Sequence, residues 1–327
     1  MPEGPEVERV RKELEIVIGK EIVKTTLTPL ALKYNRYKEI SESISYLNNT
    51  TIMAVDRKGK FLIWKFFQKS KKKFYFALNH LGMTGGWEIF FNIEKMKKEK
   101  SEEKRNFVKI IFEFSDHSVL IFDDMRNFGR FCIKESLEEL MNCSPSLKTI
   151  GVDGLKDEFT PEIFCDLLEK KKFQDKPLCE ILLDQSLVAG IGNIYKSEAL
   201  WRTKLNPFIR PKELSKSEQC LLAKNIKQVL YDALKTGGST IQNFRAVTGE
   251  GKAQEWHAVY GKEGNPCINC NTLIERIVFR QRSTFYCPTC QPPKTTTIIQ
   301  CHETDKTKKS KNTKRAKKKK TSKSQRK

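Results

Sequence analysis

The chain has 327 residues, with 61 Lys and Arg against 40 Asp and Glu, so its formal net charge is +21. Such an excess predicts a polyanionic partner, with nucleic acid favoured over an anionic membrane surface. A membrane span is not expected, because no apolar run approaches the roughly 18–20 residues that a span needs. The acidic first residues are unlike a signal peptide. Ten cysteines without such a signal indicate an intracellular, reducing compartment, which would be the nucleus in a eukaryote.

The chain begins with Met1, Pro2 and Glu3. Removal of Met1 would leave the secondary amine of Pro2 as the chain end. An α-amino group titrates near pH 7.7–8.0, roughly, so part of it is unprotonated and nucleophilic at neutral pH. Glu3 places a proton-carrying carboxylate beside this amine, and Pro5 suits the first turn of a following helix. The alternative is that Pro2 merely follows the start residue and that Glu3 is a helix N-terminal charge.

Residues 21–140 are predicted to be mainly β structure. Short apolar runs, separated by polar or glycine-containing turns, indicate a sandwich or a barrel. The runs are Glu21–Leu27, Thr51–Asp56, Phe61–Phe67, Phe74–Leu78, Trp87–Phe91, Val108–Phe114 and Ser118–Phe122. The lysine-rich piece Glu94–Lys104 is expected to be a solvated hairpin loop.

Three short segments in this region combine basic or polar groups with a glycine-containing turn. The first brings Lys60 to the start of a strand, the second carries His80 and Met83, and the third carries Arg126 and Phe128. Apolar loop tips such as Met83 and Phe128 are unfavourable in a monomer unless they pack or insert somewhere. They are therefore either core residues beneath the loops or residues that insert into a partner.

From about residue 155 the pattern becomes helical, beginning with the cap and N1 proline of Thr160 and Pro161. A Gly-Ile-Gly turn then leads through Asn193 into another helix. Such a turn can present backbone N–H groups to an anion, or it can be an ordinary helix connection. Residues 244–262 are polar and glycine-containing, which predicts a mobile loop.

Two Cys-x-x-Cys pairs, separated by sixteen residues, form a strong structural zinc signature. Their members are Cys267, Cys270, Cys287 and Cys290. Four thiolates leave no open position on the one Zn²⁺, so the ion would be structural and would hold a hairpin that carries Arg282. The other six cysteines (Cys132, Cys143, Cys165, Cys179, Cys220 and Cys301) are expected to be mostly small core residues.

The end of the chain has no apolar pattern, so it is expected to be disordered. Residues 294–327 contain 14 basic and 2 acidic side chains, which leaves a charge of +9 on the rest of the chain. The tail is expected to add salt-dependent, sequence-independent affinity for DNA, or to act as a nuclear import signal.

The order of these motifs resembles that of the formamidopyrimidine-DNA glycosylase/endonuclease VIII (Fpg/Nei) family. The motifs are the Pro-Glu start, the strand lysine, the HLGM and RNFG loops, the GIGNIY turn and the four-Cys hairpin. The resemblance covers residues 2–291. It implies an α+β multidomain fold, with a two-sheet β-sandwich at 1–140, a helix-two-turn-helix DNA-binding domain with a lesion loop at 155–262, a zinc hairpin at 263–291 and a basic tail at 292–327.

The resemblance also implies a bifunctional DNA glycosylase and AP lyase, a monomer acting on double-stranded DNA that contains oxidised bases or abasic sites. Pro2 would be the nucleophile, and Glu3 would carry protons with Lys60 and Arg282 as further catalytic residues. DNA contacts would come from Glu6, His80 and Asn193, while Met83, Arg126 and Phe128 would fill the gap left by a flipped nucleotide.

The choice of lesion stays open between oxidised purines and oxidised pyrimidines. Purines are favoured because residues 237–261 resemble the Fpg form in their length and in their closing Val-Tyr-Gly. Glu180 and Cys179 stand where some members have basic side chains, so one lesion contact is in doubt. Two alternatives belong to other classes. One is a catalytically inactive protein that binds damaged DNA, and the other is a zinc-ribbon structural or RNA-binding adaptor with a basic tail, which would not prefer damaged over intact DNA.

Overall fold

Eight strands between Glu21 and Lys134 form the N-terminal half of the protein in the computed structural model, which describes residues 1–239 and 251–294. They pair antiparallel in the order β5-β7-β6-β1-β2-β3-β4-β8. Their bounds are β1 Glu21–Leu27, β2 Thr50–Lys58, β3 Phe61–Gln68, β4 Lys73–His80, β5 Gly86–Phe90, β6 Val108–Phe114, β7 Val119–Asp123 and β8 Arg130–Lys134.

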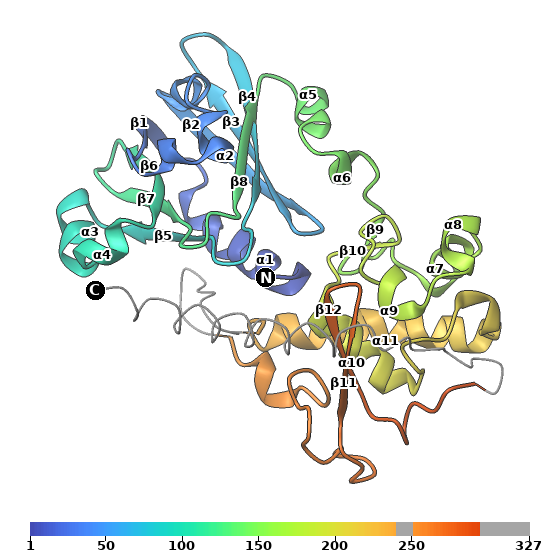
Figure 1. Cartoon of the computed structure of the whole chain (residues 1–327). Coiled ribbons are helices and arrows are strands. Elements are labelled where there is room, and N and C mark those ends of the chain that lie inside the picture. The colour runs from blue at the N-terminus through green and yellow to red at the C-terminus, as the bar shows by residue number, and fades with distance from the viewer. Residues whose placement is uncertain (240–250, 295–327) are drawn as a thin grey trace, which may run out of the picture. The chain divides into compact units, whose positions relative to one another are not determined.

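This hydrogen-bonded sheet is folded into two layers at the junction of β1 and β2, as the predicted sandwich requires (Figure 1). The junction is short, with Ile22 opposite Thr50 and one further pair beside it. Aromatic rings from the two layers then meet between them: the ring centroids of Trp64 on β3 and Trp87 on β5 lie 5.0 Å apart, and Trp87 also contacts Phe112 on β6. Burial of these large rings supplies the apolar core that holds the layers together.

The segment expected to be a solvated hairpin loop forms two short helices instead, α3 Ile93–Glu99 and α4 Glu102–Arg105. The side chain of Asn92 caps the first of them by accepting a hydrogen bond from the Lys95 N–H at 2.8 Å. Met96 is buried against β5 and β7, and Lys100 donates hydrogen bonds to Glu88 and Asp123. One apolar anchor and a local cap therefore outweigh the polarity of the segment.

Helices dominate the C-terminal half, as predicted. Their bounds are α7 Pro161–Leu168, α8 Lys171–Gln174, α9 Leu178–Ile181, α10 Asn193–Thr203 and α11 Lys216–Lys235, with the two-residue parallel strands β9 Val152–Asp153 and β10 Val188–Ala189. The hairpin β11 Glu275–Phe279 and β12 Arg282–Tyr286 follows. Short helices elsewhere are α2 Asn35–Lys38, α5 Leu137–Asn142 and α6 Pro145–Lys148, and 3-10 turns span Leu14–Val17, Ala31–Lys33, Ile44–Leu47, Pro211–Glu213 and Ala253–Trp256.

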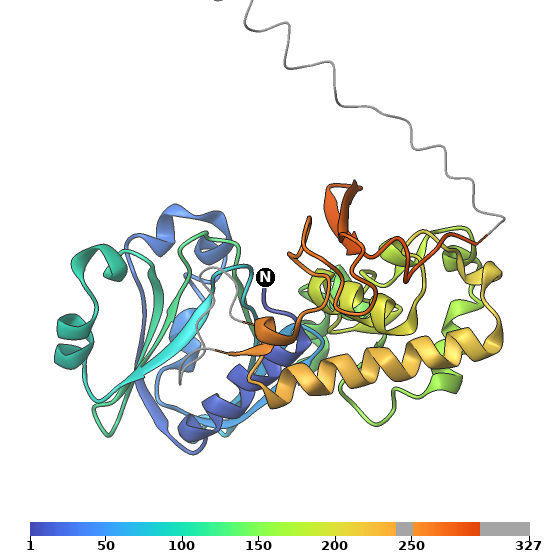
Figure 2. The ribbon, with the colours of Figure 1, turned by 90° about the horizontal axis from the view of Figure 1, so that it is seen from below.

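Helix α1, Gly4–Glu13, connects the two halves. Its Val7 and Val10 enter the core of the sandwich, while its outer side runs beside α11 (Figure 2). The Gly4 N–H donates to the carbonyl of Gly190 at 2.7 Å, and Arg9 donates to the carbonyl of Gly237 at 2.9 Å. The first residues of the chain are therefore fixed against the helical half.

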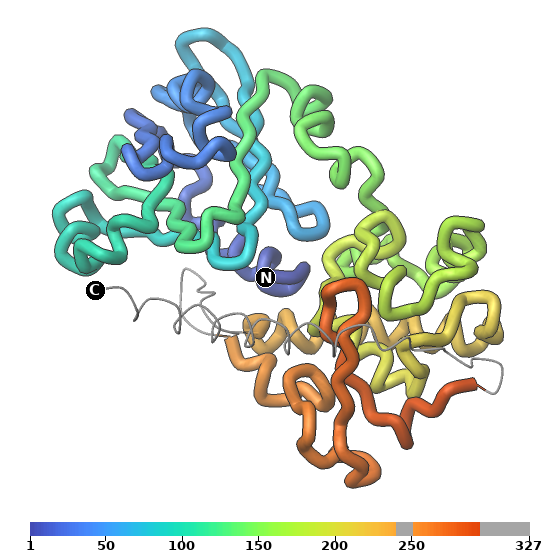
Figure 3. The backbone as a smooth tube through the Cα atoms, in the orientation of Figure 1, coloured from blue at the N-terminus to red at the C-terminus, as the bar shows by residue number. Residues whose placement is uncertain are grey.

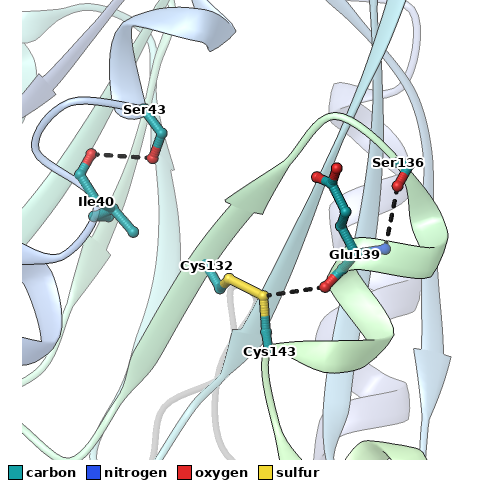
Figure 4. Close-up of a disulfide and its surroundings, with 6 residues drawn as sticks. All are labelled: Ile40, Ser43, Cys132, Ser136, Glu139 and Cys143. Carbon is teal, nitrogen blue, oxygen red and sulfur yellow. Dashed lines mark hydrogen bonds between the residues drawn. A yellow bond between two sulfur atoms is a disulfide. The ribbon is translucent and has the colours of Figure 1, made fainter.

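Two of the six scattered cysteines depart from the expectation of unpaired core residues. Cys132 on β8 and Cys143, directly after α5, form a disulfide that joins the sandwich to the connection toward the helical half (Figure 4). They meet because α5 packs on β4 and β8. Cys165 and Cys179 are buried, as predicted for small core residues. A disulfide is typical of oxidising compartments, so the reducing compartment stays a prediction.

Within residues 1–239 and 251–294, no helix is both long and apolar enough to cross a membrane. Part of the predicted loop at 244–262 is also described: residues 253–256 form a 3-10 turn, and the buried Glu198 carboxylate accepts the N–H groups of Ala258 at 2.8 Å and Tyr260 at 2.8 Å. Residues 244–250 of that loop, and the predicted tail after residue 294, lie outside the described residues.

Candidate active site

The N-terminal Pro-Glu pair is buried where α1 meets the start of α10. Pro2 and Glu3 are both buried, and the Glu3 carboxylate accepts hydrogen bonds from the N–H groups of Gly192 at 2.8 Å and Ile194 at 2.9 Å. These donors belong to the first turn of α10, whose dipole also favours a negative charge there. A Cβ on Gly192 would lie 2.4 Å from Glu3, so the glycine is required for this close approach.

Glu6 lies one helical turn further on and is also fully buried. It accepts hydrogen bonds from the Glu3 N–H at 2.7 Å, the Ser239 N–H at 2.7 Å and the Tyr195 hydroxyl. Burial raises the pKa of this carboxyl, and the neighbouring Glu3 raises it further, while the hydrogen bonds lower it. Glu6 therefore fixes the backbone beside Pro2 and connects it to the helical half.

Lys60 extends from the tight turn between β2 and β3. Burial lowers the pKa of its ammonium group, whereas the charges of Glu3 and Glu6 raise it. Arg282 is close enough to lower the same pKa. The lysine therefore lies within electrostatic range of the acidic pair at the chain end.

The turn that carries Lys60 is locked onto the helical half. Its Gly59 has a φ of +59° and donates its N–H to Asp153 at 2.7 Å. Arg57 makes a two-pronged ion pair with the same carboxylate, at 2.6 and 3.0 Å, and reaches Glu8 at 2.6 Å. Bidentate geometry of this kind is the strong form of an Arg–carboxylate pair. Strand β9 thereby positions the predicted lysine.

The chain-end amine lies in the same group of charges. Burial lowers the pKa of the Met1 amine, with Glu3 and Glu6 raising it and Lys60 and Arg126 lowering it. Removal of Met1 would transfer the free amine to Pro2, one residue closer to Glu3. The residues that tune an amine at this position are therefore already in place.

The two predicted insertion loops lie against each other. The buried carboxylate of Asp124 accepts the Thr84 hydroxyl at 2.7 Å and the Gly129 N–H at 2.7 Å, so it ties one loop to the other. Phe128 at the tip is 42% exposed, and the guanidinium of Arg126 lies 5.1 Å from its ring centroid. This exposure excludes Phe128 as core beneath its loop, while Met83 on the neighbouring loop is half-buried.

His80 stands at the end of β4, between Lys60 and a neighbouring cavity. Burial lowers the pKa of His80 to about 4, and the positive charges of Lys60 and Arg130 lower it in the same direction. Its Nδ1 accepts the Gly82 N–H at 3.1 Å, which fixes the base of the Met83 loop. The cavity, about 580 Å³ in volume, also includes Arg130, Lys134 and the disulfide in its lining.

The hairpin β11–β12 lies beside α10 (Figure 3). Buried polar side chains join the two elements. Asn193 donates its Nδ2 to the carbonyl of Ser283 at 2.7 Å. Lys196 is completely buried and donates to Asn193 at 2.7 Å and to Thr284 at 3.1 Å. Arg282 begins β12, is exposed, and lies within electrostatic range of Lys60 and Lys196.

The four predicted zinc ligands come together. The sulfur atoms of Cys267, Cys270, Cys287 and Cys290 all lie within 4.8 Å of one another. Backbone N–H groups of Asn269 and Cys290 point at sulfur, 3.5 Å from Cys267 and 3.4 Å from Cys287. Four sulfurs in one cluster, with N–H groups beside them, fit a tetrahedral structural Zn²⁺.

Sequence reasoning missed the residues that hold this site together. The sequence assigns no role to Asp124, Asp153 or Lys196, and these residues are recognised only by what they contact in the fold. Tyr195 and His257 belong to the same group. The available signal for Asp153 was an acidic residue directly before a glycine. Nothing in the sequence indicates which arginine it binds.

The fold and the site together define a class of protein in which a β-sandwich bearing a buried Pro-Glu pair at its chain end is joined to a DNA-binding helical domain and a zinc finger. Residues 1–131 match the formamidopyrimidine-DNA glycosylase N-terminal domain, residues 150–245 its H2TH domain, and residues 264–293 the zinc finger found in FPG and IleRS. The chain belongs to the formamidopyrimidine-DNA glycosylase family, as the resemblance predicted.

Relatives and solved structures agree with this assignment. The chain is 36% identical over 306 residues to the formamidopyrimidine-DNA glycosylase of Bartonella henselae, covering 89% of this chain and 100% of the relative. It is 34% identical to that of Lactiplantibacillus plantarum over 88% of this chain and 98% of the relative. The crystal structure of MutM (Fpg) from Thermus thermophilus is 32% identical with a TM-score of 0.75, covering 90% and 100%. The complex of Lactococcus lactis Fpg with abasic-site DNA is 31% identical with a TM-score of 0.74, and the match covers 89% of this chain and 100% of that structure.

Proposed function

We propose that this protein is a bifunctional DNA glycosylase and AP lyase of base excision repair, acting on oxidised purines such as formamidopyrimidines and 8-oxoguanine. The observation that carries the proposal is the convergence of the Pro2–Glu3 chain end, Lys60 and the Arg282 hairpin from three distant segments. Relatives that match 88–89% of this chain are named formamidopyrimidine-DNA glycosylase, and a related structure holds Fapy-dG DNA.

In this proposal Pro2 starts the reaction. Its nitrogen lone pair attacks C1′ of the damaged nucleotide, the bond from C1′ to the base breaks, and the base leaves with a proton. Glu3 takes the proton released by the Pro2 nitrogen and passes it to O4′ as the C1′–O4′ bond breaks, so the sugar ring opens and a cationic imine (an iminium ion) remains between Pro2 and C1′. Glu3 suits proton transfer because its carboxylate is held beside Pro2 by backbone N–H groups of α10.

The imine makes the next carbon acidic. Loss of a proton from C2′ breaks the C3′–O bond, and loss of a further proton breaks the C5′–O bond, so the strand is cut on both sides of the sugar. Water then hydrolyses the imine and frees Pro2. We assign Lys60 and Arg282 to the phosphates that leave, since positive charge stabilises the developing negative charge on oxygen.

When a nucleotide flips out of the DNA duplex, protein side chains must fill the gap that it leaves in the base stack. We assign this to Met83, Arg126 and Phe128, which lie on two loops tied by Asp124; of the three, Arg126 and Phe128 are exposed. His80 and Asn193 would contact phosphates, and Glu6 would lie near the flipped nucleotide. The Zn²⁺ is structural: the four cysteines would hold the hairpin that presents Arg282. We keep the four-part division at 1–140, 155–262, 263–291 and 292–327, and a monomer, as part of the same proposal.

The decisive experiment compares Pro2→Gly with the unchanged protein. Each is incubated with a duplex containing one 8-oxoguanine in the presence of borohydride, which reduces an imine to a stable protein–DNA link. We expect the unchanged protein to be trapped and Pro2→Gly to bind DNA without being trapped. Trapping of the variant would overturn the assignment, as would mass spectrometry showing that the active protein retains Met1.

A panel of duplexes, each with one defined oxidised base, tests the choice of lesion. We expect formamidopyrimidine and 8-oxoguanine duplexes to be cut faster than duplexes with oxidised pyrimidines. The position in doubt from the sequence, Glu180, forms ion pairs with Arg280 on the zinc hairpin at 2.5 Å and with Lys176 at 3.8 Å. Faster cutting of duplexes with oxidised pyrimidines would overturn the proposed lesion and leave the proposed reaction at Pro2 unchanged.

A further inference from the structure

A row of buried polar side chains leads from the start of α1 to the turn at residues 253–256. The Tyr195 hydroxyl donates to Glu6 and lies 3.2 Å from the hydroxyl of Ser239. That hydroxyl lies 3.0 Å from Nε2 of His257. All four side chains are at most 5% exposed. No predicted role accounts for Tyr195, Ser239 or His257.

The hydrogen bonds in this row can all point the same way. A carboxylate only accepts, so the single proton of Tyr195 is directed to Glu6. Tyr195 can then accept the proton of Ser239, and Ser239 can accept one from Nε2 of His257. This assigns the Nε2–H tautomer to a neutral His257, whose pKa burial lowers to about 4. Donors aligned in this way polarise one another toward the carboxylate.

We propose that Tyr195, Ser239 and His257 are positioning residues that hold Glu6, and through Glu6 the backbone of Glu3 and Pro2, in the orientation required for attack on the sugar. This inference rests on the proposed function. Glu6 carries the effect because its second oxygen accepts the N–H of Glu3 at 2.7 Å, one residue from Pro2. The N–H of Ser239 adds a second direct hold on Glu6, also at 2.7 Å.

Packing alone does not require these polar groups. The ring of Tyr195 stacks on Trp256, with centroids 6.5 Å apart and planes inclined by 26°, and this contact would persist without the hydroxyl. Well-packed apolar side chains commonly replace a buried polar network with little loss of stability. What an apolar replacement cannot supply is the hydrogen bond to Glu6.

The row also affects the acid–base behaviour of Glu6. Burial raises the pKa of Glu6, and the Tyr195 hydrogen bond opposes that rise because it favours the ionised form. Among residues 1–239 and 251–294, the titratable groups that face Glu6 are Glu3, Tyr195, Lys60 and the chain-end amine. Loss of the Tyr195 donor should therefore raise the pKa of Glu6 and move the acidic limb of the rate profile to higher pH.

Three full-length variants test the inference: Tyr195→Phe, His257→Leu and His257→Gln, in which the Gln amide can still donate to Ser239. Single-turnover release of 8-oxoguanine from a duplex is measured from pH 5 to pH 9, with duplex affinity and thermal unfolding measured alongside. We expect Tyr195→Phe to be slower by about tenfold, as for loss of one hydrogen bond to a charged group, with unchanged affinity and a raised acidic limb. His257→Leu should be slower in the same way, and His257→Gln should recover most of the rate.

Unchanged rates and an unchanged acidic limb in Tyr195→Phe and His257→Leu would overturn the inference, as would equal loss in the Gln and Leu variants. The two histidine variants decide the matter if Tyr195→Phe does not fold. Strand cutting of an abasic duplex by the unchanged protein is measured in parallel. Its absence would contradict the proposed function, whereas its presence with unaffected variants would contradict only the positioning role.

Discussion

The buried lysine at the β2–β3 turn has surroundings unlike those of the nearby lysine in the same segment. Lys60 is 7% exposed among Glu3, Glu6 and Arg282, whereas Lys58, two residues earlier, ends β2 with a half-buried side chain. In water a lysine stays charged to a higher pH than one that burial has partly desolvated. The position in the fold therefore gives the two lysines different burial and different charged neighbours, although the residue type is the same.

We expect Lys60→Met to lower single-turnover base release by about 100-fold, the low end of what a positioned charged or proton-transferring group contributes. Lys58→Met should change it less than threefold, roughly, since that side chain lies outside the charge cluster. Quenched-flow measurement on an 8-oxoguanine duplex compares the two. Equal losses would show that general basicity, rather than position, matters in this turn.

His80 provides a second residue-scale prediction. Its pKa is about 4 in the folded protein and near 6.5 when unfolded, so between these values the unfolded chain binds a proton that the folded one does not. The contribution of His80 therefore destabilises the fold as pH falls from 6.5 toward 4 and is absent above 6.5. His80→Asn keeps an acceptor for Gly82 but does not titrate.

Thermal unfolding at pH 7.5 and pH 5.0 checks this expectation. We expect the melting temperature of the unchanged protein to fall more than that of His80→Asn between the two pH values. His257, with a pKa also about 4, remains in both proteins and cancels in the comparison. Parallel losses in the two proteins would show that His80 does not titrate in this range.

At the scale of elements, strand β9 acts as the anchor of the catalytic turn. Asp153 is 9% exposed and receives Arg57 and the Gly59 N–H together. We expect Asp153→Ala to lower the free energy of unfolding by about 3–5 kcal/mol, because it leaves a buried guanidinium without its partner. It should also slow base release, since the Lys60 turn loses its support.

Asp157→Ala is the matched control. Asp157 is fully exposed and lies 3.8 Å from Lys227, a geometry in which an ion pair contributes little. Urea unfolding of both variants gives the comparison. A loss at Asp153 no larger than that at Asp157 would mean that the turn is held by packing alone.

The zinc hairpin is the second element with its own prediction. Four cysteines in one sulfur cluster predict one Zn²⁺ per chain by atomic emission. Cys287→Ser, or removal of the ion by a strong chelator, should loosen the hairpin that carries Arg282. We expect strand cutting to fall at least tenfold, roughly, while the sandwich keeps its own unfolding transition. Full activity in a metal-free protein would separate the hairpin from catalysis.

At the scale of the whole molecule, charge is distributed unevenly along the chain. Residues 294–327 hold +12 of the total +21. Truncation after Pro293 should weaken binding to intact and damaged DNA by similar factors and flatten the dependence of affinity on salt, because each lost phosphate contact removes released counterions. Fluorescence anisotropy from 50 to 300 mM salt measures both effects. A selective loss for damaged duplexes would instead assign lesion recognition to the tail.

Much of the plan was predictable from local chemistry. Cys-x-x-Cys spacing, the glycine turn before Asn193 and the Pro-Glu start each indicated their parts because the physical requirement lies within a few residues. The solvated loop at 94–104 was wrong because one buried Met96 and the Asn92 cap outweighed the nine charged side chains that pattern reasoning emphasised. The Cys132–Cys143 bridge was missed because the packing of α5 on β8 brings together residues that their spacing leaves unpaired.

The sequence by itself determined the order of the domains, the zinc ligands and the chemical types at the chain end, since these follow from spacing and side-chain chemistry. Only the tertiary structure decided which distant groups support them. Asp153 holds the turn that carries Lys60, and Asp124 joins the two loops. The start of α10 binds Glu3, and the Tyr195–His257 row binds Glu6. These partners are separated by tens to hundreds of residues. A buried polar group gives no local sign of its partner, because burial and pairing arise only when the whole chain has packed.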